Sequence, residues 1–182
     1  MNIKKLEDNI YYYTNVFNDI DQYMSLVKDS PLEWKEWFSS DKEMLYGQYI
    51  GGEYVLPDDL LNPIKSSIQK CLSEYVKNTG ITFGWIPEFY KIQQYSTNAY
   101  MGPHVDSIDK TAIKSPTISI VIYLNDNYEG GNICFPEQGL DIKPESGSMV
   151  IFPSYPPYYH DPKPVTKGTK YMCPVFCFKE PF

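Results

Sequence analysis

The sequence contains only two histidines, and one of them stands two residues from an aspartate. His104 and Asp106 occur in the segment Gly-Pro-His-Val-Asp, and His160 occurs in Tyr-Tyr-His-Asp-Pro. In an extended segment, positions i and i+2 project to the same side, so the imidazole and the carboxylate can both reach one metal ion. His160, 54 residues beyond Asp106, is the only other imidazole that can join them.

Such a set of ligands indicates a particular kind of metal chemistry. Two nitrogens and one oxygen on one face of an octahedral metal leave three positions free, which is the arrangement that non-haem Fe(II) oxygenases use to bind a cosubstrate and O2. The alternative is that the His-x-Asp pattern occurs by chance, because an isolated histidine is more often a surface or core residue. The residues around the pattern must decide between the two.

The first half of the chain predicts helices that could support such a site. Apolar residues recur at helical spacing between about residues 19 and 79, most clearly over 61–75. Proline is tolerated in the first turn of a helix, so Pro63 predicts that this helix begins between residues 58 and 62, and Gly80 is a helix-ending residue. A shorter helix is predicted over residues 18–28.

The second half, from about residue 88, reads as antiparallel β-structure, because short β-branched and aromatic runs alternate with Gly, Pro, Asn and Asp. In the strand predicted over 117–124, one face is apolar and the other is mixed. The apolar face comprises Ile118, Ile120, Ile122 and Leu124, and the mixed face comprises Thr117, Ser119, Val121 and Tyr123. The apolar face is expected to pack under the helices. The mixed face fits either a cavity wall or a solvated surface.

The segments around the histidines resemble the 2-oxoglutarate/Fe(II) oxygenases of the prolyl 4-hydroxylase type. The resemblance extends from about residue 88 to 178. It rests on Tyr95 nine residues before His104, the His-x-Asp pattern, 121–131, Phe135-Pro136, 142–153, His160, and 164–171 with Lys170 ten residues after His160. It implies an α+β fold with a double-stranded β-helix (jelly-roll) core over about 85–180. Helical support over about 10–80 would pack on one sheet, within a single domain of residues 1–182.

The resemblance also implies roles for individual residues. His104, Asp106 and His160 would bind iron, and Lys170 would pair with the far carboxylate of 2-oxoglutarate. All 16 basic residues are lysine, so no arginine can take that part. The turn-rich segment 161–168 can reverse the chain, so we expect the strand with Lys170 to lie beside the one that ends at His160. The alternative is that Lys170 is one solvated lysine among many.

Several aromatic residues are candidates with structural alternatives. Tyr95 and Tyr123 can contact the cosubstrate through their hydroxyl groups, but the chain has 17 tyrosines. Trp34, Trp37 and Trp85 can line a substrate groove or belong to the core. Tyr100 stands four residues before His104 where the family more often has three, so the pocket around 98–102 is expected to differ in shape.

Two glycines and the cysteines are predicted to have structural roles. Gly130 and Gly131 are expected to adopt positive φ in a connection between strands. The four cysteines show no paired Cys-x-x-Cys spacing and are expected to be reduced. Cys173 and Cys177 are too far in sequence from a third thiolate or free imidazole to indicate a zinc site and are expected to be buried.

Composition limits the partners. The net charge of -7 and pI near 4.8 argue against a broad basic surface, so a nucleic-acid substrate is disfavoured. No stretch approaches the roughly 18 apolar residues of a membrane span, and the N-terminus lacks the apolar run of a signal peptide. We therefore expect a cytoplasmic protein that does not bind membranes. The oligomeric state is not predicted.

The function that the resemblance implies is a dioxygenase that uses Fe(II), 2-oxoglutarate and O2, with ascorbate as a candidate reductant, and that releases succinate and CO2. Its expected substrate is a prolyl residue of a peptide or protein, and a small molecule is the alternative. A different class of protein would be a cupin-like domain that binds or senses metal without turnover, or a structural jelly roll without metal. Lys170 discriminates between them, because a metal-binding domain needs no cation for a dicarboxylate.

Overall fold

The computed structural model describes residues 1–38, 45–52, 56–87, 90–108 and 115–179. Its largest part is an antiparallel sheet of eight strands in the order β1-β2-β10-β6-β13-β5-β4-β3. These are β1 (Asn2–Glu7), β2 (Ile10–Thr14), β3 (Lys35–Phe38), β4 (Leu45–Gly51), β5 (Lys91–Tyr95), β6 (Pro116–Tyr123), β10 (Ser148–Pro153) and β13 (Lys170–Phe178).

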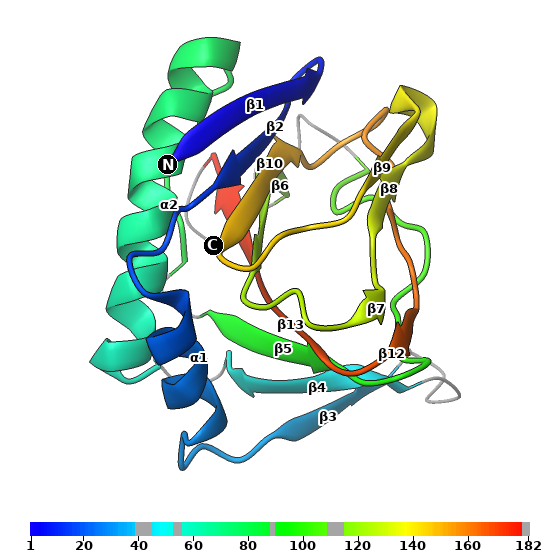
Figure 1. Cartoon of the computed structure of the whole chain (residues 1–182). Helices are drawn as coiled ribbons and strands as arrows, with labels where there is room; N and C mark the ends of the chain where they lie inside the picture. The colour runs from blue at the N-terminus through cyan, green and yellow to red at the C-terminus, as the bar shows by residue number, and fades with distance from the viewer. Residues whose placement is uncertain (39–44, 53–55, 88–89, 109–114, 180–182) are drawn as a thin grey trace.

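Two small antiparallel sheets lie opposite the large one (Figure 1). One has the order β11-β8-β9 and the other pairs β12 with β7. Their strands are β7 (Glu129–Gly130), β8 (Ile133–Phe135), β9 (Leu140–Ile142), β11 (Asp161–Pro162) and β12 (Val165–Lys167). The space between the large and the small sheets contains the side chains that the sequence predicts to be functional.

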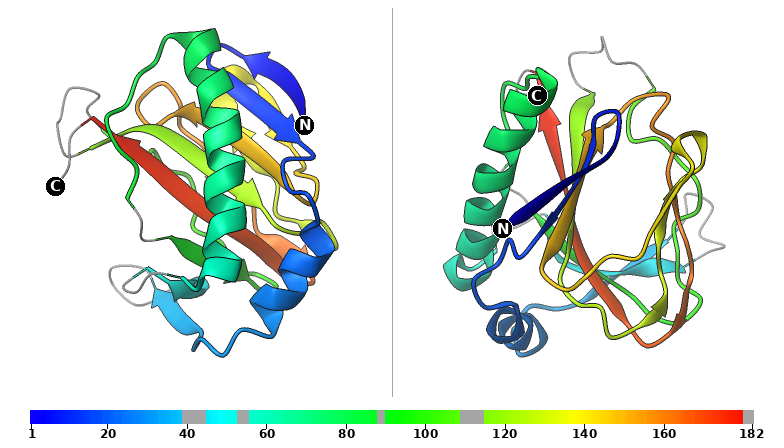
Figure 2. Two further views of the ribbon diagram at one scale, coloured as in Figure 1. Left: turned by 90° about the vertical axis from the view of Figure 1, so that its left-hand side faces the viewer. Right: turned by 45° about the horizontal axis from the view of Figure 1, so that its top comes forward.

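Two helices lie on the other face of the large sheet (Figure 2). α1 (Ile20–Lys28) begins after Asp19, whose side chain accepts a hydrogen bond from the N–H of Gln22 at 3.0 Å. α2 (Asp58–Thr79) ends at Gly80, which has a left-handed φ of 71°. Both helices were predicted to within two residues. Pro63, however, lies in the second turn of α2 instead of the first, where it removes one backbone hydrogen bond.

The first half of the chain also contains four strands that the sequence patterns did not indicate, β1 to β4. The helical content is therefore smaller than expected. β1 shows no alternation of polar and apolar burial, because it is an almost fully exposed edge strand. β2, a continuous run of buried residues at Ile10–Tyr13, pairs with β10 and so extends the large sheet.

β6 divides the interior into two clusters. Its apolar face packs in one cluster with residues of α1 and α2, among them Met24, Leu60 and Ile64. Val121 and Tyr123, on its other face, belong to a second cluster together with Ile133 and Phe135 from β8 and Phe152 from β10. Both faces of β6 are thus buried, and the solvated-surface alternative for its mixed face is wrong.

The predicted glycine geometry is confirmed, since Gly130 and Gly131 have φ values of 71° and 66°. The burial predicted for Cys173 and Cys177 is confirmed, and all four cysteines are free and buried. Among the described helices, none combines the length and apolar composition needed to cross a membrane.

Candidate metal centre

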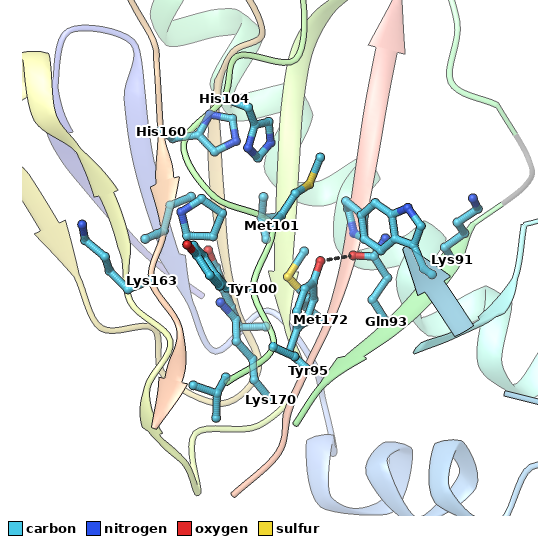
Figure 3. Close-up of a pocket in the computed structure, with 18 of the residues that line it drawn as sticks. Lys91, Gln93, Tyr95, Tyr100, Met101, His104, His160, Lys163, Lys170 and Met172 are labelled. Carbon is cyan, nitrogen blue, oxygen red and sulfur yellow. Dashed lines mark hydrogen bonds between the residues drawn. The ribbon is translucent and has the colours of Figure 1, made fainter. Parts of the chain in front are cut away.

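The two histidines lie side by side because their backbones pair. His104 and His160 form an isolated antiparallel bridge, in which the N–H of each donates to the carbonyl of the other at 2.9 Å. Their ring centroids are 4.2 Å apart, and both rings lie at the same end of a pocket (Figure 3). Asp106 follows two residues after His104, so a short backbone bridge brings together three groups that are distant in sequence.

The atoms of these groups are arranged to share a cation. Nδ1 of His104 is 2.9 Å from the carbonyl oxygen of Gly102 and Nδ1 of His160 is 3.4 Å from that of Tyr158. Because a carbonyl only accepts, Nδ1 carries the hydrogen in the neutral rings and Nε2 keeps a lone pair. The Nε2 atoms lie 3.4 Å and 3.9 Å from Oδ1 and Oδ2 of Asp106, and the three ligand atoms are all within 4.8 Å of one another. Lone pairs that face a carboxylate need a cation between them.

The pKa values of the three candidate ligands are shifted in different directions. Burial by itself lowers the pKa of His104, but hydrogen bonds to Asp106 and Gly102 outweigh it, so that the pKa is raised. Burial by itself raises the pKa of Asp106, whereas the hydrogen bond with His104, the charge of His160 and the hydrogen bond from Ser119 lower it overall. For His160, burial dominates and lowers the pKa to about 4. At neutral pH the site therefore holds a carboxylate and at least one neutral imidazole.

Lys170 lies at the opposite end of the same pocket (Figure 3). Its side chain is 3% exposed. Nζ donates to the carbonyl of Gly131 at 2.7 Å and is 5.1 Å from the centre of the Tyr123 ring. Burial lowers the pKa of Lys170 to about 7. The solvated-lysine alternative is thus wrong, and an ammonium with three hydrogens has room for a further acceptor.

The prediction for the strand that carries Lys170 was wrong. β13 lies between β6 and β5 in the large sheet, whereas β11, which follows His160, pairs with β8 in a small sheet. The turn-rich segment does not form a hairpin, because β12 inside it pairs with β7 before the chain crosses to the large sheet. Gly131 makes this crossing compact, since a Cβ there would meet the Tyr128 ring at 2.7 Å and Cδ of Lys170 at 3.3 Å.

The two candidate tyrosines flank Lys170. Tyr95 on β5 is its direct partner across the strands, and Tyr123 on β6 lies beneath its ammonium. The Tyr95 hydroxyl donates to Oε1 of Gln93 at 2.9 Å (Figure 3). Burial raises the pKa of both phenols, which therefore stay neutral and able to donate hydrogen bonds at all ordinary pH values.

These residues line one cavity of about 360 Å³, which is the size of a small-ligand site. The partly exposed part of its lining includes the aromatic residues Trp37, Tyr100 and Phe176, and the exposed lysines Lys91 and Lys163 also line it. Trp34 packs edge-on against Tyr171 and Trp85 packs against Phe178, which supports the core alternative for these two tryptophans.

Sequence reasoning gave no role to two polar residues near the site. Ser119 donates from its hydroxyl to Oδ2 of Asp106 at 2.6 Å, and its only signal was its place on the mixed face of β6. Gln93 accepts the hydrogen of Tyr95 and lines the cavity. Its position two residues before Tyr95, on the same face of a strand, was the signal that could have identified it.

Comparison with known proteins places this geometry in context. Residues 90–178 match the family model of the 2OG-Fe(II) oxygenase superfamily. No curated protein matches the chain significantly.

Three of the similar solved structures, all at low sequence identity, illustrate the likeness. The viral collagen prolyl hydroxylase of Paramecium bursaria Chlorella virus-1, in complex with 2OG, is 17% identical with a TM-score of 0.66, over 92% of this chain and 94% of that one. A Trichoplax adhaerens prolyl hydroxylase, in complex with a hypoxia inducible factor oxygen degradation domain peptide fragment, is 13% identical with a TM-score of 0.70, over 94% and 84%. A Pseudomonas putida prolyl-4-hydroxylase is 13% identical with a TM-score of 0.70, over 96% and 94%. At these identities the likeness shows a shared fold.

Proposed function

Residues 90–178 of this chain are a 2OG-Fe(II) oxygenase domain, and from this premise we propose that the enzyme hydroxylates a prolyl residue of a peptide or protein. One observation carries the proposal. The His104, Asp106 and His160 cluster and the buried ammonium of Lys170 lie at opposite ends of one cavity. A metal and a dicarboxylate can therefore occupy it together.

The residues fit the metal that the family uses. Two imidazole lone pairs and a carboxylate converge on one point, which is the donor set that suits Fe(II) with open positions. His104, Asp106 and His160 would hold the ion. When bound, Fe(II) with 2-oxoglutarate and O2 supplies an oxidation in which one oxygen atom enters a substrate C–H bond as hydroxyl and the other enters succinate, with release of CO2.

The chain itself contributes binding and orientation. Lys170 would pair with the far carboxylate of 2-oxoglutarate, and the neutral hydroxyl of Tyr123 would donate to it. The Tyr95 hydroxyl would donate to the carboxylate by exchanging its hydrogen bond to Gln93 for one to the ligand. The cavity is enclosed around these groups, because Lys170 is 3% and Tyr123 is 1% exposed. The binding energy of the cosubstrate is thus used to fix its reacting end beside His104 and His160.

The partly exposed lining supports a peptidyl substrate. Trp37, Tyr100 and Phe176 offer ring faces that suit the apolar pyrrolidine ring of proline. The solved prolyl hydroxylases that share this fold point to the same class of substrate, and one of them was solved with a peptide. An oxygenase for a small molecule is the second candidate.

The wider assignments belong to the same proposal. The large sheet and the small sheets that face each other across the cavity would be the two halves of a double-stranded β-helix, with α1 and α2 as its support. Residues 1–182 would form one domain. A cytoplasmic location and the use of ascorbate as reductant stay predictions.

The test begins without oxygen. Anaerobic addition of Fe(II) and 2-oxoglutarate should produce the weak visible charge-transfer band of the chelate, and addition of O2 should then yield succinate. Incubation with proline-containing peptides should give a mass gain of one oxygen. Metal binding without the band would favour the cupin-like metal-binding domain. If the charge-transfer band formed but oxygen were transferred only to a small molecule and to no peptide, the peptidyl substrate would be ruled out.

A further inference from the structure

Asp106 lies outside the strands, yet two contacts fix it to the large sheet. The N–H of the next residue, Ser107, donates to the carbonyl of Ser154 at 2.8 Å. The hydroxyl of Ser119, in β6, donates to Oδ2 of Asp106 at 2.6 Å. Ser154 follows the last residue of β10, and β10 pairs with β6. Both the backbone beside the carboxylate and the carboxylate itself are therefore held by two neighbouring strands.

The serines form a directed chain of hydrogen bonds. Their Oγ atoms are 2.7 Å apart. A serine hydroxyl has one hydrogen, and because that of Ser119 is used on Asp106, Ser154 must donate to Ser119. The two residues are 1% and 0% exposed, so little solvent can compete for these bonds. The length of 2.6 Å is typical of a charge-assisted O–H···O⁻ bond, which is among the stronger hydrogen bonds in proteins.

We propose that Ser119, supported by Ser154, is a positioning residue that keeps Asp106 a one-oxygen ligand. The hydroxyl takes one lone pair of Oδ2, which lies 3.9 Å from Nε2 of His160, and so favours Oδ1, which lies closer to a histidine, 3.4 Å from Nε2 of His104, as the oxygen that would bind the metal. This inference rests on the proposed function and adds to it. Carboxylates bind metals through one oxygen or through both. Three protein ligands leave three octahedral positions only if each ligand takes one.

The number of metal coordination positions explains why the contact of Ser119 with Asp106 matters for cosubstrate binding. 2-Oxoglutarate would take two positions and O2 one, so a carboxylate bound through both oxygens would compete with one of them. Without the Ser119 hydroxyl, Asp106 could rotate and offer both oxygens. Loss of the hydroxyl should then change how the metal and the cosubstrate bind, beyond any loss of protein stability.

The experiment compares Ser119→Ala with Ser119→Thr, which keeps the hydroxyl, and with a matched control, Thr117→Val. Thr117 lies two residues earlier on the same face of β6 and is 3% exposed. Its hydroxyl donates to the carbonyl of Cys177 at 3.2 Å, so it serves the sheet and not Asp106. The readouts are anaerobic titration with Co(II) or Fe(II) and the charge-transfer band that 2-oxoglutarate produces on the Fe(II) protein.

Ser119→Ala should bind metal about 10- to 100-fold more weakly, because the carboxylate of Asp106 is no longer held in its binding orientation, and should shift or weaken the band, because a second carboxylate oxygen then competes with 2-oxoglutarate for a metal position. Ser119→Thr and Thr117→Val should keep the wild-type affinity and band, even if Thr117→Val is less stable. Ser154→Ala should change both readouts in the same direction as Ser119→Ala, but less.

Two results would overturn the proposal while the proposed function stands. One is a wild-type metal affinity and band in Ser119→Ala. The other is an equal loss in Thr117→Val, because it would trace the effect to any buried hydroxyl of β6. If the wild-type protein itself gives neither metal binding nor the band, the proposed function fails and the role of Ser119 fails with it.

Discussion

Replacement of Lys170 by methionine is expected to stabilise the protein in the absence of ligand while it weakens cosubstrate binding. Burial lowers the pKa of Lys170 from 10.5 to about 7, and at 1.36 kcal/mol per pKa unit this corresponds to about 5 kcal/mol against the charged form. Methionine fills a similar volume without charge, although it leaves the Gly131 carbonyl without its donor, at a cost of about 1 to 3 kcal/mol. The net gain should be about 2 to 4 kcal/mol.

The pH dependence follows from the direction of the shift. Between pH about 7 and 10.5 the unfolded chain binds more protons at Lys170 than the folded chain does, so the stability of the ligand-free wild type rises with pH across that window. The advantage of Lys170→Met is therefore full below pH 7 and declines above it. At pH 6 it should raise the unfolding midpoint by about 5 to 15 °C.

Cosubstrate binding should show the opposite dependence. A bound carboxylate restores the pKa of Lys170, so binding takes up a proton above pH 7 and weakens by up to tenfold per pH unit there. Loss of the ammonium should weaken 2-oxoglutarate binding by about 2 to 5 kcal/mol, or 30-fold and more, and should remove this slope. Thermal melts without ligand and anaerobic calorimetry with 2-oxoglutarate in buffers of different ionisation enthalpy measure both effects.

Lys167→Met is the matched control, because Lys167 lies three residues earlier and its side chain is 75% exposed beside Glu129. It should change neither stability nor 2-oxoglutarate affinity appreciably. A destabilised Lys170→Met protein, or one that binds 2-oxoglutarate as the wild type does, would refute the reasoning about the buried charge.

Three other predictions concern the metal centre and its neighbours. His160→Ala should reduce iron-dependent succinate production to background, and retention of more than a trace would remove His160 from the ligand set. Tyr95→Phe removes a hydroxyl but no ring, so it should weaken 2-oxoglutarate binding about three- to tenfold with kcat little changed; a fall in kcat alone would contradict that role. Metal affinity should fall between pH 8 and 6, because His104, whose pKa is raised, must lose its proton to bind; a flat profile by calorimetry would exclude this competition.

The sequence predicted elements whose signal is local. The alternation in β6 and the spacing along α2 each report which side of an element is buried, and the glycines at 130 and 131 report a backbone angle. β1 escaped prediction because its residues are exposed on both faces and carry no pattern. Its position is set by pairing with β2, which no local pattern encodes.

The candidate site shows the same difference between features with a local sequence signal and features that depend on distant pairings. The residue types and spacings around His104, Asp106, His160 and Lys170 were sufficient to place them in one cavity. They were not sufficient to predict the strand neighbours of Lys170, because the crossing from the small sheets to the large one depends on pairings between distant segments. Ser119 was missed for a related reason, since its contact with Asp106 depends on contacts between distant segments, such as the hydrogen bond from Ser107 to Ser154.

The two ends of the cavity carry groups of opposite charge, the Asp106 carboxylate and the Lys170 ammonium, and this links the cost of the cavity in stability to its selectivity. Lys170 is buried with a single described acceptor, the neutral carbonyl of Gly131, and the histidine lone pairs face the carboxylate of Asp106. A metal ion would compensate the carboxylate at the histidine end, and the far carboxylate of a dicarboxylate would compensate the ammonium at the Lys170 end. A monocarboxylate bound at the metal would leave Lys170 buried without its partner, and should therefore bind more weakly by much of the energy that the ammonium contributes. The same buried lysine that destabilises the free protein thus selects a ligand with two acidic ends.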